Sequence, residues 1–238
     1  MIYAAILAGG IGSRMQNGSL PKQFLEIGGK PLLIYTVEAF LRCEEIEHIV
    51  VAVTKGWLDH AEELLEKAFG DEPRLSVTVG GATRLESLVH ACVALSGRYG
   101  IADEDILLTH DGARPFVSAD TIRENIEKMA CYDCVTTAIP TIDTVLRSEN
   151  GAEVDAIPQR ETILAVQTPQ TFRLGELITM IDSLNEAEKS MLTDGAKIYL
   201  LRGKSVGIAR GTSENIKITE QKDLLFAEAF LKMTTTKQ

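Results

Sequence analysis

The chain has little positive charge: its 24 lysines and arginines stand against 34 aspartates and glutamates, which gives a net charge of −10. Proteins that bind nucleic acid normally carry a basic surface, so this balance argues against a nucleic-acid partner. It also requires any site for an anionic ligand to gather its cations locally. The chain lacks a run of the ~20 apolar residues that span a membrane and a secretory signal pattern. We therefore expect a cytoplasmic protein with no membrane partner.

Cysteine is also scarce, with four in 238 residues. Cys131 and Cys134 have C-x-x-C spacing, but a zinc site of this type needs a second pair. A redox motif would open a helix after a strand, whereas this pair follows a helical pattern and leads into an apolar run. The four histidines show no metal-ligand spacing. These absences predict ordinary core or boundary cysteines and no structural metal.

What is present is an alternation of apolar runs and helical patterns, in a chain long enough for one sizeable domain. Strands are expected at residues 2–7, 49–53, 75–79 and 106–109. Helices are expected at residues 31–41, 57–69, 85–95 and 122–129. Such alternation predicts an α/β fold with a doubly wound, mainly parallel sheet. Ligands of these sheets bind beyond the carboxyl ends of the strands.

The alternation of strand and helix patterns stops after residue 136. Short strand-like pieces around a turn signal are expected at residues 138–140, 144–146 and 154–157. A hairpin alone cannot bury a core, so we expect it to pack on a partner or a second subunit; an edge hairpin of the same sheet is the alternative. The remaining elements are expected as a helix at 174–181, strands at 198–201 and 206–209, an extended piece at 215–219 and a C-terminal helix.

A glycine-rich loop follows the first strand, in the stretch from Leu7 to Met15. Glycine lets a backbone approach a ligand closely, and a helix N-terminus favours an anion. Met15 stands where a dinucleotide fingerprint needs its third glycine, and the P-loop pattern is absent as well. With Arg14 and Lys22 nearby, the loop predicts a phosphate-bearing ligand. An ordinary glycine-rich connection with surface cations is the alternative.

Further charged side chains follow other predicted strands, so they are expected at the same edge of the sheet. Six cations and one acid suit a site that handles several phosphates and one divalent metal. Any one of them alone would be an ordinary surface residue, and the prediction rests on the set. The set is Arg14, Lys22, Arg84, Asp111, Arg114, Arg160 and Lys217.

Six motifs give the chain a more specific resemblance. They are L-A-G-G-x-G-x-R-M, P-K-Q-F, G-G-x-x-R, H-D-x-A-R-P-F, Q-T-P-Q-x-F and N-I-K-I-T, in this order from residue 7 to residue 219. The chain resembles the cytidylyltransferase family that acts on 2-C-methyl-D-erythritol 4-phosphate or ribitol 5-phosphate. The resemblance implies an enzyme, a nucleotidyltransferase that transfers CMP from CTP to a sugar-alcohol phosphate and releases pyrophosphate. It implies a single Rossmann-like, three-layer domain over residues 1–238, with a projecting β-hairpin arm at 137–160 that forms a homodimer.

The resemblance also assigns roles to residues of this chain. Arg14 and Lys22 match the pair that stabilises charge on the triphosphate, and Lys217 matches a lysine at the α-phosphate. Asp111 matches a carboxylate near Mg²⁺, the implied cofactor. The nucleotide-binding positions are Leu7, Ala8, Gly9, Gly10, Gly80, Gly81, Ala82, Thr83, Arg84, Leu85, Glu86, Ser87, Asp111 and Gly112.

The positions around the acceptor also follow from the resemblance: they are Arg114, Thr144, Arg160, Thr168 and Thr193. Arg160 is additionally expected to take part in catalysis. Because Thr144 and Arg160 flank the hairpin, they are expected to complete the site of the neighbouring subunit.

Three stretches favour D-ribitol 5-phosphate as the acceptor and CDP-ribitol as the product. They are residues 1–4, 156–160 and 192–197, which resemble the ribitol branch of the family. Residues 110–114 suit the erythritol branch equally well, so 2-C-methyl-D-erythritol 4-phosphate, an isoprenoid precursor, is the alternative acceptor. A nucleotide-sugar-binding or glycosyl-transferring domain, which usually needs a D-x-D-type metal motif, is a more distant alternative.

Overall fold

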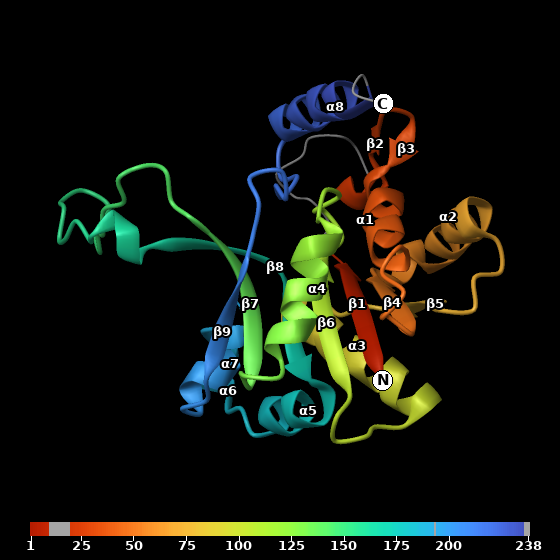
Figure 1. The fold of residues 1–238 in the computed structure, drawn as a ribbon, viewed down its shortest axis with the longest axis horizontal. Coiled ribbons are helices and arrows are strands. Elements are labelled where there is room, and N and C mark those ends of the chain that lie inside the picture. Colours follow the sequence, from red (N-terminus) through yellow and green to blue (C-terminus); the bar gives the residue numbers. More distant parts are fainter. Residues whose placement is uncertain (10–19, 193, 236–238) are drawn as a thin grey trace.

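The computed structural model describes residues 1–9, 20–192 and 194–235. A seven-stranded sheet runs through its centre in the order β5-β4-β1-β6-β8-β7-β9 (Figure 1). In that order the strands are Leu75–Val79, His48–Val53, Ile2–Ala8, Ile106–Asp111, Leu164–Arg173, Cys134–Pro140 and Val206–Arg210. The sheet is mainly parallel, but β8 runs antiparallel to both of its neighbours, β6 and β7.

Helices cover both faces of the sheet, which gives the predicted three layers. The helices are α1 (Leu32–Leu41), α2 (Leu58–Phe69), α3 (Arg84–Tyr99), α4 (Ala119–Lys128), α5 (Leu174–Asp182), α6 (Glu186–Ser190), α7 (Ala196–Leu201) and α8 (Gln221–Thr235). One buried cluster joins the sheet to α3, α5 and α7, and another joins it to α1, α2 and α4. The last helix, α8, packs on the small β2–β3 hairpin (Glu26–Ile27 and Lys30–Pro31).

Strand β1 explains why the sequence shows a continuous apolar run. Tyr3, Ala5 and Leu7 lie in the cluster with α3, whereas Ala4 and Ile6 lie in the cluster with α1. Side chains alternate between the two faces of a strand, and a strand covered on both faces needs apolar residues throughout. The first strand is therefore buried on both faces, as its apolar run predicts.

Several predicted extended segments differ from the structure. Residues 198–201 belong to helix α7, because Ile198 and Tyr199 are buried there against the core; a short apolar run alone does not distinguish a buried strand from a buried helix. Residues 144–146 and 154–157 form no named strand, and a single bridge joins Arg147 to Ala156. Residues 215–219 lie outside the sheet.

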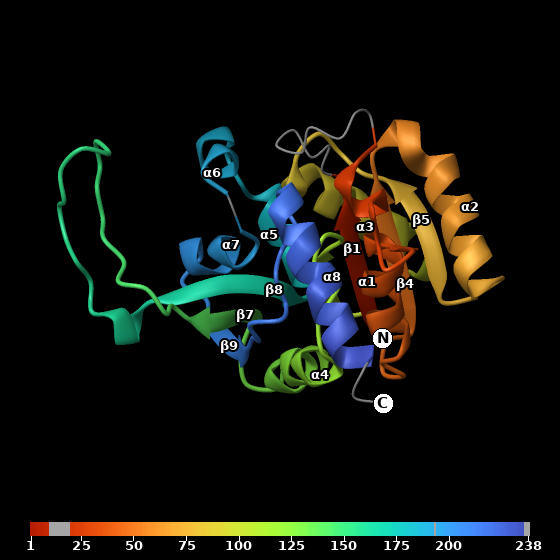
Figure 2. The same ribbon diagram turned by 90° about the horizontal axis from the view of Figure 1, so that it is seen from above.

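Residues 141–163, which we call the arm, connect β7 to β8 and extend away from the body in both views (Figures 1 and 2). The predicted arm begins at residue 137, but residues 137–140 pair with β8 inside the sheet. The arm exposes large apolar side chains: Ile142 is 85% exposed and Ile157 is 65% exposed. No helix in the described ranges is long and apolar enough to cross a membrane.

Candidate active site

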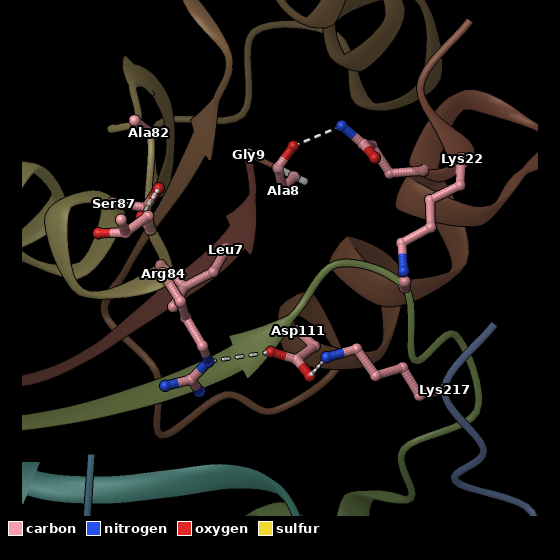
Figure 3. A pocket seen from close by; sticks show the side chains of 12 residues that line it. Leu7, Ala8, Gly9, Lys22, Ala82, Arg84, Ser87, Asp111 and Lys217 are labelled. Atoms are coloured by element: carbon pink, nitrogen blue, oxygen red, sulfur yellow. Dashed lines mark hydrogen bonds and ion pairs between the residues drawn. The ribbon is translucent and has the colours of Figure 1, made fainter. Parts of the chain in front are cut away.

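Two neighbouring cavities lie at the carboxyl edge of β1 and β6. The first, of about 160 Å³, is the main cavity (Figure 3), and its lining residues are Leu7, Ala8, Gly9, Lys22, Gln23, Ala82, Thr83, Arg84, Ser87, Asp111, Ala113 and Lys217. The second, of about 350 Å³, is the side cavity, and it is lined by Arg84, Asp111, Arg114, Val166, Gln167, Thr168, Asp194 and Lys217. Arg84, Asp111 and Lys217 line both cavities, so they mark the junction.

Asp111 is the centre of the charge cluster at this junction. Its Oδ1 lies 3.3 Å from Arg84 Nε, and its Oδ2 lies 2.8 Å from Lys217 Nζ and 3.6 Å from Arg114 Nε. Figure 3 shows Arg84 and Lys217 reaching the carboxylate from opposite sides, with Lys22 pointing toward the same region. Burial alone would raise the pKa of Asp111, but Arg84, Lys217 and Arg114 hold it far below its usual range. The carboxylate is therefore charged at neutral pH.

His110 precedes Asp111 and is completely buried. Its Nε2 lies 3.0 Å from the Arg114 carbonyl oxygen, which can only accept a hydrogen bond, so this nitrogen carries the proton. Its Nδ1 accepts from the Thr168 hydroxyl at 3.0 Å, and Thr168 Oγ1 accepts from the Asp111 N–H at 3.1 Å. Burial lowers the pKa of His110 to about 4. His110 is thus a neutral structural residue that fixes the backbone around Asp111.

The loop from Gly80 to Ser87 forms one wall of the main cavity. Thr83 caps α3 by accepting from the Glu86 N–H at 3.1 Å, and the Glu86 carboxylate accepts from the Ala82 N–H at 2.6 Å. A side chain at Gly81 would lie 2.1 Å from Glu86 Cβ, so only glycine fits beside this carboxylate. Ser87 Oγ accepts from the Gly81 N–H at 3.1 Å. These contacts hold the loop in shape before any ligand binds.

The predicted nucleotide residues divide into two groups in this arrangement. Those that line the main cavity are Leu7, Ala8, Gly9, Ala82, Thr83, Arg84, Ser87 and Asp111. Those that are not among its lining residues are Gly80, Gly81, Leu85, Glu86 and Gly112. Gly112 donates its N–H to the Leu7 carbonyl at 2.9 Å. Gly10 and Arg14 lie outside the described residues.

Gln23 is a lining residue to which the sequence argument gave no role. It is buried, and its Nε2 donates to the Ala8 carbonyl. The Thr54 hydroxyl similarly donates to the Gly9 carbonyl at 3.0 Å. Together they fix the end of β1 where the glycine loop begins. The sequence signal that could have identified Gln23 is its place in the P-K-Q-F motif, directly after Lys22. In the structure both residues belong to the short 3₁₀ turn Lys22–Phe24.

The segment around Asn215 positions Lys217. Asn215 is completely buried, and its Nδ2 donates to the Thr168 carbonyl at 2.8 Å. The Ile218 N–H donates to the Ala113 carbonyl at 2.9 Å, and Arg114 Nη1 donates to the Asn215 carbonyl at 2.8 Å. The extended piece predicted here therefore binds to the strand-end loops rather than to a sheet, and this contact brings Lys217 to Asp111.

The acceptor residues predicted from the sequence are only partly brought together. Arg114 and Thr168 line the side cavity. Thr144 and Arg160 belong to the arm and line neither cavity; Arg160 Nη1 donates to the Ile142 carbonyl at 3.3 Å. Thr193 lies outside the described residues. One chain therefore builds the cation cluster of the site without the two arm residues.

The donor set suits a magnesium ion that arrives with a ligand. Among the residues described, Asp111 is the one carboxylate that lines the main cavity, and no group of three or more histidine, cysteine or acidic side chains could hold a metal. Mg²⁺ is commonly bound by one or two carboxylates together with substrate phosphates, so Asp111 fits it as a single protein ligand. The D-x-D triplet of the chain, residues 103–105, precedes β6 and lies at the opposite end of that strand from Asp111.

Comparison with known proteins matches the chain to cytidylyltransferases. The family model described as 2-C-methyl-D-erythritol 4-phosphate cytidylyltransferase (IspD) matches residues 2–233. A ribitol-5-phosphate cytidylyltransferase of Streptococcus pneumoniae (strain Hungary19A-6) is 42% identical over 232 residues, which cover 97% of this chain and 99% of that protein.

Solved structures agree with the family match. The crystal structure of 4-diphosphocytidyl-2C-methyl-D-erythritol synthase from Anaerococcus prevotii DSM 20548 is similar with a TM-score of 0.82 at 29% identity, covering 97% of this chain and 96% of that one. The 2-C-methyl-D-erythritol 4-phosphate cytidylyltransferase from Thermus thermophilus has a TM-score of 0.72 at 27% identity, covering 98% of this chain and 100% of that one.

The fold and the family match define the class of this protein: it is an α/β nucleotidyltransferase of the cytidylyltransferase type. Within that class, the chain belongs to the 2-C-methyl-D-erythritol 4-phosphate cytidylyltransferase (IspD) family.

Proposed function

We propose that the protein transfers CMP from CTP to D-ribitol 5-phosphate, with CDP-ribitol and pyrophosphate as products. The observation that carries this proposal is the junction of two cavities at Asp111, where Arg84, Arg114 and Lys217 surround one carboxylate. A transferase of this type must hold two phosphorylated substrates side by side. The Streptococcus pneumoniae relative named for ribitol 5-phosphate, 42% identical over 97% of the chain, supports the choice of acceptor.

The main cavity is proposed as the CTP site. Its walls carry small residues and backbone from Leu7 to Gly9 and from Ala82 to Thr83, which leaves room for a base to approach the backbone. Lys22 faces the region where the triphosphate would lie, and we expect Arg14 to join it there. Their charge stabilises the pyrophosphate as it leaves.

The side cavity is proposed as the acceptor site. Arg114 and Lys217 supply positive charge for the phosphate of the acceptor, and Thr168 supplies a hydroxyl. Because Lys217 also lines the main cavity, it lies where the acceptor phosphate would meet the α-phosphate of CTP. This placement favours direct reaction between the two phosphates.

The reaction needs no general base. The second pKa of a phosphate monoester is about 6, so the acceptor is mostly a dianion at neutral pH. One of its oxygens attacks the α-phosphorus, a new P–O bond forms, and the bond to pyrophosphate breaks. The residues of this chain bring the two anions together and neutralise the charge that accumulates. His110 takes no part in proton transfer, because it is neutral and both ring nitrogens are already hydrogen-bonded.

A magnesium ion, held by Asp111 and the phosphates of CTP, would supply positive charge to the triphosphate. The carboxylate is charged at neutral pH and lines the main cavity, as this role requires.

We further propose that the arm forms a homodimer and completes the site of a second subunit. In one chain the arm leaves Ile142 and Ile157 largely exposed, and it carries Thr144 and Arg160 away from both cavities. Docking of the arm on a second copy would cover the apolar side chains and deliver Arg160 to the acceptor phosphate. We expect this dimer to act in the cytoplasm.

The second candidate acceptor is 2-C-methyl-D-erythritol 4-phosphate. The observation in its favour is the structural similarity to synthases named for 4-diphosphocytidyl-2C-methyl-D-erythritol, such as the one from Anaerococcus prevotii at a TM-score of 0.82. Their identity to this chain is 29% or lower, below the 42% of the ribitol-named relative. The two acceptors share the phosphate and differ in the carbon chain.

The deciding experiment measures pyrophosphate release with CTP and Mg²⁺ in the presence of either acceptor. We expect faster turnover with D-ribitol 5-phosphate. Preference for 2-C-methyl-D-erythritol 4-phosphate would replace the first candidate with the second. Release with neither acceptor would refute both. Substituting ATP or GTP for CTP serves as the control for the base, and we expect little product with either.

A further inference from the structure

The side cavity contains a second carboxylate, Asp194, to which neither the motifs nor the charge cluster gives a role. Its surroundings differ from those of Asp111. Asp111 is paired with Arg84, Arg114 and Lys217, whereas no cation of the described ranges lies within ion-pair distance of Asp194. Of the two carboxylates that line this cavity, Asp111 is neutralised by cations and Asp194 is not.

Asp194 is held by neutral donors. Its Oδ2 accepts from Gln170 Nε2 at 2.7 Å, and its Oδ1 accepts from the Ala196 N–H at 2.7 Å. Gln170 is completely buried on β8, and its Oε1 accepts from the Gly195 N–H at 3.3 Å. Each carboxylate oxygen can accept more than one hydrogen bond. The carboxylate is therefore fixed in position, and its oxygens can still accept hydrogen bonds from a ligand in the cavity.

The chemistry of this arrangement points to hydroxyl groups. An ionised carboxylate accepts hydrogen bonds and donates none, and it repels phosphate. Its natural ligand in a cavity beside a phosphate site is therefore the hydroxylated part of the same substrate. Hydrogen bonds to a charged acceptor are about twice as strong as those between neutral groups.

We propose that Asp194 is a specificity residue that accepts hydrogen bonds from the hydroxyls of the acceptor, and that Gln170 is the residue that positions it. This inference rests on the proposed function, since it takes the side cavity as the acceptor site. The cations of the cavity bind the phosphate end of the acceptor, and Asp194 binds the polyol chain. The position of Asp194 relative to the cations selects acceptors by the placement of their hydroxyls.

The test combines a variant with altered substrates. Asp194→Asn keeps the size of the side chain and removes its charge. The acceptors are D-ribitol 5-phosphate and its monodeoxy analogues, each lacking one hydroxyl. A hydrogen bond to a charged group contributes about 1.5–3 kcal/mol, so in the unaltered enzyme we expect at least one analogue to lose about 10-fold or more in kcat/KM. In Asp194→Asn we expect the kcat/KM for ribitol 5-phosphate to fall by a similar factor. The kcat/KM for that analogue should then be little lower than the value for ribitol 5-phosphate.

Three further variants separate recognition from a structural effect. Gln170→Met removes the donor to Asp194. It should also weaken discrimination between ribitol 5-phosphate and its monodeoxy analogues, while the KM for CTP stays near its original value. Asp120→Asn, at a fully exposed position on α4, is the matched control and should leave all constants unchanged. Asp194→Glu keeps the charge on a longer side chain and should change which analogue is disfavoured.

Three outcomes would overturn the proposal. Equal discrimination by the unaltered enzyme and Asp194→Asn would show that the carboxylate does not contact the hydroxyls, while leaving the proposed function intact. A rise in the KM for CTP as large as the rise for the acceptor would show a general structural role. Failure of the unaltered enzyme to use any polyol phosphate would refute the proposed function, and this inference with it.

Discussion

At the scale of single residues, the site depends on one buried carboxylate and the cations around it. Asp111 stays charged because Arg84, Lys217 and Arg114 offset the cost of its burial. Its backbone is fixed by Thr168, whose own hydroxyl is held by the neutral ring of His110. Charge is thus preorganised before a substrate arrives, which is the main requirement for a reaction between two anions.

Lys22 is the described cation of the main cavity that we expect to contribute most to the departure of pyrophosphate. Removing one preorganised donor from such a site commonly lowers turnover about 100-fold or more. Lys22→Ala should therefore reduce kcat by at least this factor while the thermal unfolding curve stays close to the original. Steady-state pyrophosphate release measures the effect, and Lys67→Ala on the exposed face of α2 is the control. Near-normal turnover would remove Lys22 from the mechanism.

His110 makes the stability of the protein depend on pH. Burial lowers its pKa from 6.5 to about 4 in the folded state. Below pH 6.5 the unfolded chain therefore binds a proton that the folded chain does not, and stability falls as the pH falls. The loss is complete below about pH 4 and amounts to about 3 kcal/mol, at 1.36 kcal/mol per pH unit.

Urea unfolding at about pH 7 and pH 4 measures this effect. His110→Asn removes the titrating ring, and the variant starts from a lower stability. Between pH 7 and pH 4 its free energy of unfolding should fall by about 3 kcal/mol less than that of the original protein. His60→Asn, at an exposed position, controls for the loss of a histidine. Parallel pH profiles for His110→Asn and the original protein would contradict the assignment.

At the scale of elements, the N-terminus of α3 shapes the main cavity. The capping box between Thr83 and Glu86 satisfies backbone N–H groups that would otherwise lack partners. The Glu86 carboxylate also accepts from the N–H groups of Ala82 and Thr83, which line the cavity. The helix start therefore contributes to both stability and ligand binding.

Removing the cap tests this double role. Thr83→Ala should lower the free energy of unfolding by about 1 kcal/mol and raise the KM for CTP more than the KM for the acceptor. Thr83→Ser keeps the hydroxyl and should behave like the original protein. Urea unfolding and steady-state kinetics measure the two effects. A loss of stability with an unchanged KM for CTP would limit the cap to a structural role.

At the scale of the whole molecule, the arm decides whether one chain can form a complete active site. The cation cluster lies within the body, while Thr144 and Arg160 lie on the arm, which extends away from it (Figure 1). In a symmetric dimer, each arm would reach the site of the partner. The body and the arm of one chain would then serve different active sites.

Complementation between inactive variants tests this arrangement. We expect Lys22→Ala and Arg160→Ala each to be nearly inactive as homodimers. A heterodimer of the two, purified through two different tags, has one site with both substitutions and one site with neither, so it should recover about half of the original activity. A heterodimer of two differently tagged Lys22→Ala chains should stay inactive. Failure of the mixed heterodimer to recover activity would place Arg160 at the site of its own chain or at none.

Much of the fold followed from local patterns. The apolar run of β1 and the helical spacing from Leu58 to Phe69 each specify one element, because burial on two faces or on one stripe leaves a period in the sequence. The strand-end positions of the glycine loop and Asp111 followed from the alternation of elements. The segment 198–201 was predicted as a strand and is helical, since its burial against Phe172 and the sheet is a property of the folded core.

The sequence by itself determined the α/β class, the edge of the sheet where the charged residues gather, and the order of the motifs. These depend on residue type and spacing along the chain. Only the tertiary structure decided which side chains meet: β8 lies antiparallel between β6 and β7, which brings Thr168 to Asp111 and Gln170 to Asp194. Strand pairing between distant segments is selected by the packing of the whole core, and no local pattern records it.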